Sequence, residues 1–231
     1  RGSPLRVSHL RDPLGPELHF ASESFIDEVA HAAGADPVAF RLRYLSGNAR
    51  HAAVVKAVAE KARWQARPNP NRGKGEVMVG RGVSYTERNG TVVAMIAEVE
   101  VERSSGRVWA KKFTVAHDCG QIINPDGLKL TIEGNVVMAT SRTLFEEVRF
   151  TENNVASVDW VTYPILELAD APEAIDIVLI NRPEMAPQGA GEPSTRTVPA
   201  AIANAIFDAT GVRMRRVPIT PERMKAALAR T

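Results

Sequence analysis

A glycine-rich segment followed by a carboxylate is the part of this 231-residue sequence best suited to chemistry. The segment reads Pro187-Gln188-Gly189-Ala190-Gly191-Glu192-Pro193-Ser194. Two glycines allow a backbone to approach a ligand closely, and a carboxylate directly after them can act as a general base. A helix that begins a few residues later would favour the ionised form of Glu192 through its free N–H groups. The alternative is a tight turn with a surface carboxylate, since short glycine motifs are common.

A second candidate segment, residues 117–125, follows a predicted strand. It places an acid, a thiol, a glycine and an amide at the strand end, in the residues Asp118, Cys119, Gly120 and Asn124. Loops at strand ends often bind ligands. The alternative interpretation is local, because Asp118 and Asn124 can cap their own turns and Cys119 can be a small buried apolar side chain.

Other catalytic motifs do not occur in the sequence. Its five histidines never form a His-Glu-x-x-His pattern, so we expect no metal held by protein side chains. The glycines around Lys74 match neither a dinucleotide-binding nor a phosphate-binding loop. No serine lies in a Gly-x-Ser-x-Gly turn, so a hydrolase of the Ser-His-Asp type is not supported.

The apolar spacing predicts helices in the first part of the chain and hairpins after it. Helices are predicted over 23–33, 38–45 and 51–64, and they are followed by an exposed linker over 65–76 that is rich in Pro, Gly and charge. We therefore divide the chain into a helical segment 1–64 that completes an upstream domain, the linker, and an α+β domain 77–231.

Within 77–231 the pattern predicts a mixed set of strands and helices. A hairpin is predicted over 93–101 and 108–116, with further strands over 145–151 and 174–180. Helices are predicted over 132–144, from Pro199 to a stop at Gly211, and over 221–229. The expected class is α+β, with mixed sheet hairpins packed with helices.

Composition and charge exclude several classes of protein. With 29 Lys and Arg against 27 Asp and Glu, the formal net charge is +2, too small to attract polyanions, so we expect no nucleic-acid partner. No apolar stretch approaches the length of a membrane helix, and the first residues lack a signal peptide's apolar core. The opening lacks methionine, which favours a fragment or processed piece of a longer protein.

Several separated motifs together resemble the molybdenum-binding large subunit of the xanthine oxidase family. In chain order they are Phe25-Ile26-Asp27-Glu28, Asp36-Pro37-Val38, Asp118-Cys119-Gly120, Ile123-Asn124-Pro125, Ile132-Glu133-Gly134, Glu146-Glu147-Val148 and Gly189-Ala190-Gly191-Glu192. The similarity covers essentially the whole chain. It looks closest to the bacterial type that includes isoquinoline 1-oxidoreductase and nicotinate dehydrogenase.

The resemblance implies a molybdenum hydroxylase that oxidises an aldehyde or an N-heteroaromatic substrate with water as the oxygen source. Glu192 matches the family's catalytic general base, and Arg11 falls where relatives place an arginine that faces the substrate. The metal is held by a molybdopterin, commonly as the cytosine dinucleotide, and needs no protein ligand. The residues that would contact this cofactor are Asp118, Cys119, Gly120, Asn124, Gly134, Gly189, Ala190 and Gly191.

The resemblance also implies partners and departures. The family's upstream half and its iron-sulfur subunit, which carries the iron-sulfur clusters, would be separate from this chain, which we expect to be inactive alone. The sequence does not give the compartment, which in this family is cytoplasmic or associated with the bacterial cell membrane. Thr131 and Met138 stand where relatives commonly have glutamines, and Asp12-Pro13-Leu14 replaces a Gly-Phe-Gly after Arg11. These departures keep open a second interpretation, a non-catalytic cofactor-binding or assembly domain.

Overall fold

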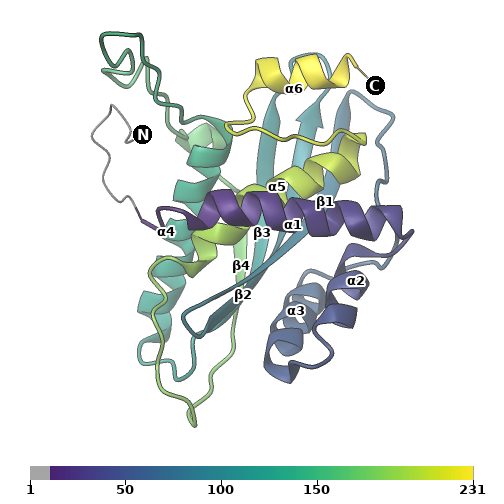
Figure 1. Cartoon of the computed structure of the whole chain (residues 1–231), viewed down its shortest axis with the longest axis vertical. Helices are drawn as coiled ribbons and strands as arrows, with labels where there is room; N and C mark the ends of the chain where they lie inside the picture. Colours follow the sequence, from purple (N-terminus) through teal and green to yellow (C-terminus); the bar gives the residue numbers. More distant parts are fainter. Residues whose placement is uncertain (1–10, 231) are drawn as a thin grey trace.

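The computed structural model describes residues 11–230 and contains one four-stranded sheet with helices on both faces (Figure 1). The strands are β1 (Val77–Arg88), β2 (Thr91–Glu102), β3 (Val108–Asp118) and β4 (Ala174–Leu179), in this order across the sheet. The first three are antiparallel neighbours, and β4 pairs parallel to β3. The sheet and its helices confirm the α+β class.

The helices form two layers around the sheet. Their bounds are α1 (Gly15–Ala32), α2 (Pro37–Tyr44), α3 (Ala49–Lys61), α4 (Pro125–Leu144), α5 (Pro193–Thr210) and α6 (Pro221–Leu228), with a short 3-10 helix at Leu168–Asp170. Helix α5 packs on β1 and β2, with α1 across it and α4 beside it, whereas α3 covers β2 and β3 from the other face.

The alternation of side chains along β2 supplies both cores. Met95 and its neighbours two residues away pack under α4 and α5, whereas Ile96 and its neighbours pack against α3. Successive side chains of a strand point to opposite faces, so a strand covered on both sides is apolar throughout. From Glu98 onward, around the bulge between Glu98 and Val99, partly buried glutamates alternate with buried valines.

Two glycines of β1 determine how closely α5 lies on the sheet. A Cβ atom added at Gly82 would lie 2.2 Å from the Ala205 nitrogen, and one added at Gly80 would lie 2.2 Å from the Ala205 oxygen. Backbone therefore packs directly on backbone at this crossing, which fixes the position of α5 along β1.

Most predicted elements are confirmed, and two are wrong. The helices over 23–33, 38–45, 51–64, 132–144 and 221–229 and the strands over 93–101, 108–116 and 174–180 are present, with ends shifted by a few residues or by one to two turns. No strand forms over 145–151, where a single bridge joins Phe150 to Val155. Helix α5 begins at Pro193, so Pro199 lies inside it, whereas Gly211 ends it at φ +79° as predicted.

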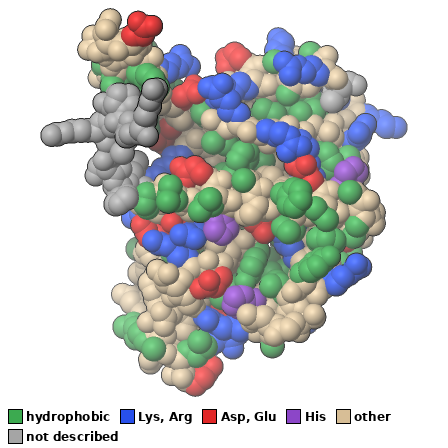
Figure 2. All heavy atoms as spheres, viewed as in Figure 1, with side chains coloured by type: hydrophobic (Ala, Val, Ile, Leu, Met, Phe, Trp, Pro, Cys, Tyr) green, Lys and Arg blue, Asp and Glu red, His purple; other side chains and the backbone are tan. Residues whose placement is uncertain are grey.

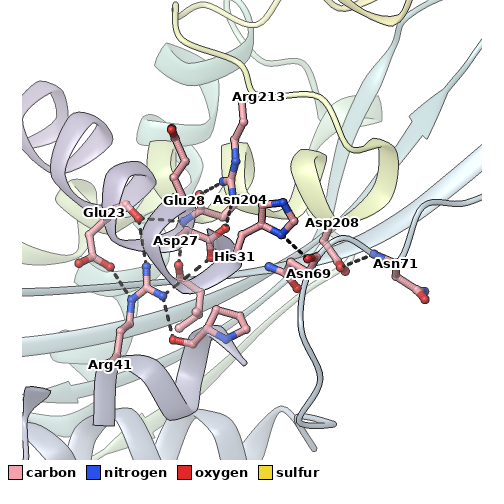
Figure 3. A network of polar contacts seen from close by, with 12 residues as sticks. Glu23, Asp27, Glu28, His31, Arg41, Asn69, Asn71, Asn204, Asp208 and Arg213 are labelled. Atoms are coloured by element: carbon pink, nitrogen blue, oxygen red, sulfur yellow. Dashed lines mark hydrogen bonds and ion pairs between the residues drawn. The ribbon is translucent and has the colours of Figure 1, made fainter. Parts of the chain in front are cut away.

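A buried polar network ties the helical segment to the rest of the chain (Figure 3). Arg41 of α2 pairs with Glu23 of α1 at 2.9 Å. Arg213, which follows α5, pairs with Asp27 of α1 at 2.7 Å and donates to the Asn204 side chain at 3.0 Å. Buried charges with partners resist rearrangement, because removing one partner leaves the other uncompensated. Helix α2 is therefore held to α1, and α1 is held to the segment that follows α5.

Residues 65–76 form neither helix nor strand and are mostly exposed. They are nevertheless bonded to the end of α5, since the Arg67 guanidinium pairs with Asp208 at 2.7 Å and the Gly73 N–H donates to the Ala209 carbonyl at 2.8 Å. The division of the chain at this segment stays a prediction.

The surface carries charges of both signs. Figure 2 shows Lys and Arg side chains interspersed with Asp and Glu over the viewed face. Within residues 11–230 no helix combines the length and the apolarity that crossing a bilayer requires.

Candidate functional site

Backbone hydrogen bonds bring the two segments singled out in the sequence together. The Gln188 N–H donates to the Cys119 carbonyl at 2.8 Å, and the Arg182 N–H donates to the Gly120 carbonyl at 3.1 Å. The parallel pairing of β3 and β4 brings both strand ends to the same edge, so the chain that leaves each strand meets the other there. The 117–125 turn and the 187–192 segment thus form one site.

Gly120 is the residue that allows this close contact. Its φ is +76°, and a Cβ atom added there would lie 2.4 Å from the Ala186 carbonyl oxygen. Other residues rarely adopt this backbone conformation, and none would fit against Ala186 without moving it.

The two segments and the start of α4 line a groove of about 390 Å³. The lining residues are Cys119, Gln121, Ile122, Ile123, Asn124, Gly127, Leu128, Thr131, Pro187, Gln188, Ala190 and Gly191. Four of the predicted cofactor contacts, Cys119, Asn124, Ala190 and Gly191, therefore share one concave surface.

The backbone beside this groove is open and carries unused donors. A Cβ atom at Gly189, Gly191 or Gly134 would meet no atom within 4 Å. Among the described residues, the N–H groups of 189–192 have no acceptor, and the buried Ser194 hydroxyl has no partner. A run of free N–H groups before a helix suits an anionic or heterocyclic ligand. The residues present thus fit a group bound through backbone contacts.

The Asp118 side chain points away from this groove. Its carboxylate is fully buried and pairs with Arg50 at 2.7 Å and with Arg182. It also accepts the Gly120 N–H at 3.1 Å. Burial alone would raise the pKa of Asp118, but hydrogen bonds from the two arginines outweigh it and lower the pKa below its ordinary value. The Asp118 side chain therefore holds the turn, and a contact between Asp118 and a cofactor stays a prediction.

Cys119 and Asn124 have the structural roles that the sequence offered as the alternative to ligand binding. Cys119 is 5% exposed, and burial raises the pKa of its thiol. The Asn124 side chain accepts the Gly127 N–H at 2.9 Å and so caps α4. Any contact that these residues make with a ligand in the groove would come from the atoms that these roles leave free.

Glu192 directly follows Gly191, which lines the groove, but is not itself one of the lining residues. One carboxylate oxygen accepts the Asp12 backbone N–H at 2.7 Å, and the other pairs with Arg88. The side chain is 30% exposed, so the carboxylate is held but still reachable. Both carboxylate oxygens of Glu192 are thus engaged, and the side chain stays partly exposed.

Arg11 directly precedes Asp12, whose N–H binds Glu192, but Arg11 itself makes no hydrogen bond or ion pair with Glu192. Its guanidinium donates to the Asn135 side chain at 3.0 Å, and the other amide atom of Asn135, its Nδ2, has no partner among the described residues. Thr131 donates its hydroxyl to the Gly127 carbonyl at 2.8 Å, and Met138 accepts a weak contact from Arg142.

Sequence reasoning missed three residues of this site. Asp12 pairs with Arg196 through two contacts, at 2.7 and 2.8 Å, and both Asp12 and Arg88 contact Glu192. One signal was available, since Asp12 replaces a small residue after Arg11 and places a charge where none is expected. No local signal marks Arg88 or Arg196.

Within residues 11–230 no three His, Cys, Asp or Glu side chains gather in a way that could hold a metal ion. The donors at the site are instead backbone N–H groups and arginines. Such donors suit an organic or anionic group.

Comparison with known proteins places this geometry in a family. The family described as the molybdopterin cofactor-binding domain matches residues 21–172. One component of the nicotinate dehydrogenase of Pseudomonas putida is 44% identical over 97% of this chain, and the β component of the isoquinoline 1-oxidoreductase of Brevundimonas diminuta is 32% identical over 93%. The chain spans 20% and 27% of these two relatives, respectively.

A solved structure shows the same fold. The aldehyde oxidoreductase of Desulfovibrio gigas superposes with a TM-score of 0.79 over 96% of this chain and 42% of its own, at 16% sequence identity. The matched domain and the two relatives confirm the resemblance to the molybdenum-binding subunits of the xanthine oxidase family. This chain belongs to the molybdopterin cofactor-binding domain family.

Proposed function

We propose that this chain is the part of a molybdenum hydroxylase that supplies the general base and one wall of the cofactor groove. The observation that carries the proposal is the position of Glu192, a partly exposed carboxylate that is held by two contacts and directly follows Gly191, a lining residue of the groove. A fixed carboxylate next to an open backbone can take a proton from a group bound in the groove.

The cofactor we assign to this groove is a molybdenum-pterin, and the resemblance to bacterial relatives favours its cytosine dinucleotide form. Ala190 and Gly191 would contact it through backbone atoms, and Cys119 and Asn124 would contact it from the turn after β3. Gly134 and Gly189 offer open backbone at the margins, and Gly120 positions the turn. When bound, this group supplies the two-electron oxidation.

The chain's own residues provide positioning and proton transfer. The Glu192 carboxylate takes the proton of the nucleophile derived from water, and the Asp12 N–H keeps that carboxylate oriented. Arg11 lies on the substrate side. The substrate class is an aldehyde or an electron-poor N-heteroaromatic ring, in keeping with the names of the relatives.

The remaining parts of the enzyme would come from other polypeptide. The upstream portion of the molybdenum subunit would form the opposite wall of the groove, and an iron-sulfur subunit would carry electrons away. This division is supported by the share of the relatives that the chain spans, 20% to 27%.

The decisive experiment is Glu192→Gln in the assembled enzyme. Glutamine keeps the acceptor for the Asp12 N–H but cannot take a proton, so we expect kcat to fall by about 10²- to 10⁴-fold. Molybdenum content, measured by mass spectrometry, should be unchanged. Glu184→Gln is the matched control, because Glu184 is exposed in the same segment. Full turnover by Glu192→Gln would refute the base assignment.

One observation favours the second candidate, a non-catalytic cofactor-binding or assembly domain. The Thr131 hydroxyl is used within α4 and so does not replace a glutamine amide in the groove. A lost contact of this kind costs on the order of 1 kcal/mol. Purified, assembled protein that retains the molybdenum-pterin but oxidises no aldehyde or heteroaromatic compound would favour this candidate.

A further inference from the structure

We propose that Arg88 and Asp12 are positioning residues that hold the Glu192 carboxylate and set the pH range in which it acts as a base. The inference rests on the proposed function of Glu192 as base. It is drawn from contacts that join three distant parts of the chain: the end of β1, the turn before α1 and the start of α5.

Arg88 reaches Glu192 from the last residue of β1. Its guanidinium pairs with one oxygen of the Glu192 carboxylate, and its Nε lies 3.7 Å from the Asp12 carboxylate. The Arg88 side chain is 25% exposed, so it lies between the protein interior and the mouth of the site. Arg88 thus bridges two carboxylates of different burial.

Asp12 is the buried member of this pair. Its side chain is 2% exposed and is held by Arg196, with contacts at 2.7 and 2.8 Å. A Cβ atom at Gly15 would lie 2.0 Å from the Asp12 carboxylate, so only glycine leaves room for it. The Asp12 carboxylate therefore has one fixed position.

The backbone of the same turn supplies a second contact. Arg11 and Asp12 have φ values of +23° and +56°, a region that non-glycine residues rarely occupy. In this conformation the Asp12 N–H points at the Glu192 carboxylate, which it reaches at 2.7 Å. Unfavourable backbone conformations persist where surrounding contacts determine them, and they gather at functional sites.

The charges alternate along the cluster, which we call the Glu192 clamp: Glu192, Arg88, Asp12 and Arg196. The negative charges of the two carboxylates and the positive charges of the two guanidinium groups are equal in number. Among the charged and titratable side chains around the clamp, Glu17, Arg142 and Glu146 line one pocket with Asp12, and His19 of α1 is bonded to the Thr86 hydroxyl at 2.7 Å. Arg88 favours the ionised form of Glu192, whereas the Asp12 charge opposes it by drawing on the same guanidinium. The two residues should therefore shift the pH dependence of the base in opposite directions.

The test compares Arg88→Met and Asp12→Asn in the assembled enzyme by the pH dependence of kcat/KM. For Arg88→Met we expect the acid limb of the pH profile to move up by about one pH unit. We expect kcat to fall about tenfold and KM to stay within about twofold of the unchanged enzyme. For Asp12→Asn, which keeps the backbone N–H, the acid limb should move down. The separate variant Arg88→Lys should leave the acid limb where it is in the unchanged enzyme, because lysine keeps the positive charge. Arg43→Met, an exposed arginine on α2, is the matched control and should change neither quantity.

A second readout does not need turnover. Infrared difference spectra of the full subunit without cofactor, with Glu192→Gln as the baseline, follow protonation of this carboxyl and should show the same opposite shifts. Unchanged or same-direction shifts in the two variants would overturn the inference. If Arg88→Met gives little folded protein, the Asp12→Asn and Arg88→Lys arms decide. Should Glu192→Gln retain full turnover, the proposed function fails; a collapse of Glu192→Gln with unmoved profiles refutes only the clamp.

Discussion

At the scale of single residues, His117 shows how burial sets a titration. It lies on β3 between Val93 and Leu179 in register, is fully buried, and neither ring nitrogen has a partner among the described residues. Burial lowers the pKa of His117 to about 4, partly opposed by the charge of Asp118. The imidazole is therefore neutral in the folded chain at physiological pH.

This gives a prediction for stability. Between the unfolded pKa of about 6.5 and the folded value of about 4, the unfolded chain binds a proton at His117 that the folded chain does not. The free energy of unfolding should thus fall by about 2 kcal/mol from pH 7 to pH 5 through this residue. Urea unfolding at both pH values measures it. His117→Leu should remove most of that difference, and an equal drop in the variant would contradict the assignment.

The candidate site was predictable from the sequence only where its residues are neighbours. The segment 189–192 and the turn at 118–120 each carry a local signal of glycine and acid. Arg88 and Asp12 reach Glu192 only because β1, the turn before α1 and α5 meet in the fold. Contacts between residues so far apart in sequence depend on packing, which no local pattern encodes.

At the scale of elements, replacing Gly134 of α4 or Gly82 of β1 by alanine should change the free energy of unfolding in opposite directions. Gly134 lies on the exposed face of α4 with open space around it. Alanine there should raise the free energy of unfolding by about 0.5–1 kcal/mol, because glycine is a poor helix former. It should also lower retention of the molybdenum-pterin by the assembled enzyme if Gly134 lies on the cofactor. Thermal unfolding and metal content measure the two effects, and equal retention would remove Gly134 from the contacts.

The contrasting variant is Gly82→Ala. Its added methyl group would lie 2.2 Å from the Ala205 nitrogen, so α5 must shift on the sheet. We expect a loss of about 1–3 kcal/mol in the free energy of unfolding. Urea unfolding tests this, and an unchanged midpoint would show that α5 is free to move on β1.

The elements themselves show which patterns predict structure reliably. Helices with apolar side chains at regular spacing were predicted, and Gly211 marked the end of α5. Strand β1 was not predicted, because Gly80 and Gly82 look like turn residues until α5 is placed on them. Pro199 suggested a helix start, but the burial of nearly all of α5 outweighs the cost of an interior proline.

At the scale of the whole molecule, the groove has one wall in this chain and opens to solvent on the other side. The segment 148–168 also exposes several large apolar side chains, Trp160, Val161 and Leu168 among them. Such surface is usually covered in a functional protein. Under the proposed function, the chain alone therefore lacks the enclosure that catalysis needs.

We therefore expect the chain by itself to show no turnover and to retain no molybdenum-pterin. Production together with the remaining part of a molybdenum subunit and an iron-sulfur subunit should restore both. Metal analysis and substrate oxidation in the two preparations provide the comparison, with Glu192→Gln as the inactive reference. Oxidation by the chain alone would show that one wall is sufficient.

The fit of Gly120 against Ala186 limits how this site can be redesigned. Three backbone bonds and one glycine keep the segment after β4 in step with the turn after β3. Insertion or deletion of a single amino acid there would break the register of these backbone hydrogen bonds and displace the carboxylate at position 192. Libraries that aim at new substrates should accordingly vary outward side chains such as Glu184 and keep the spacing constant.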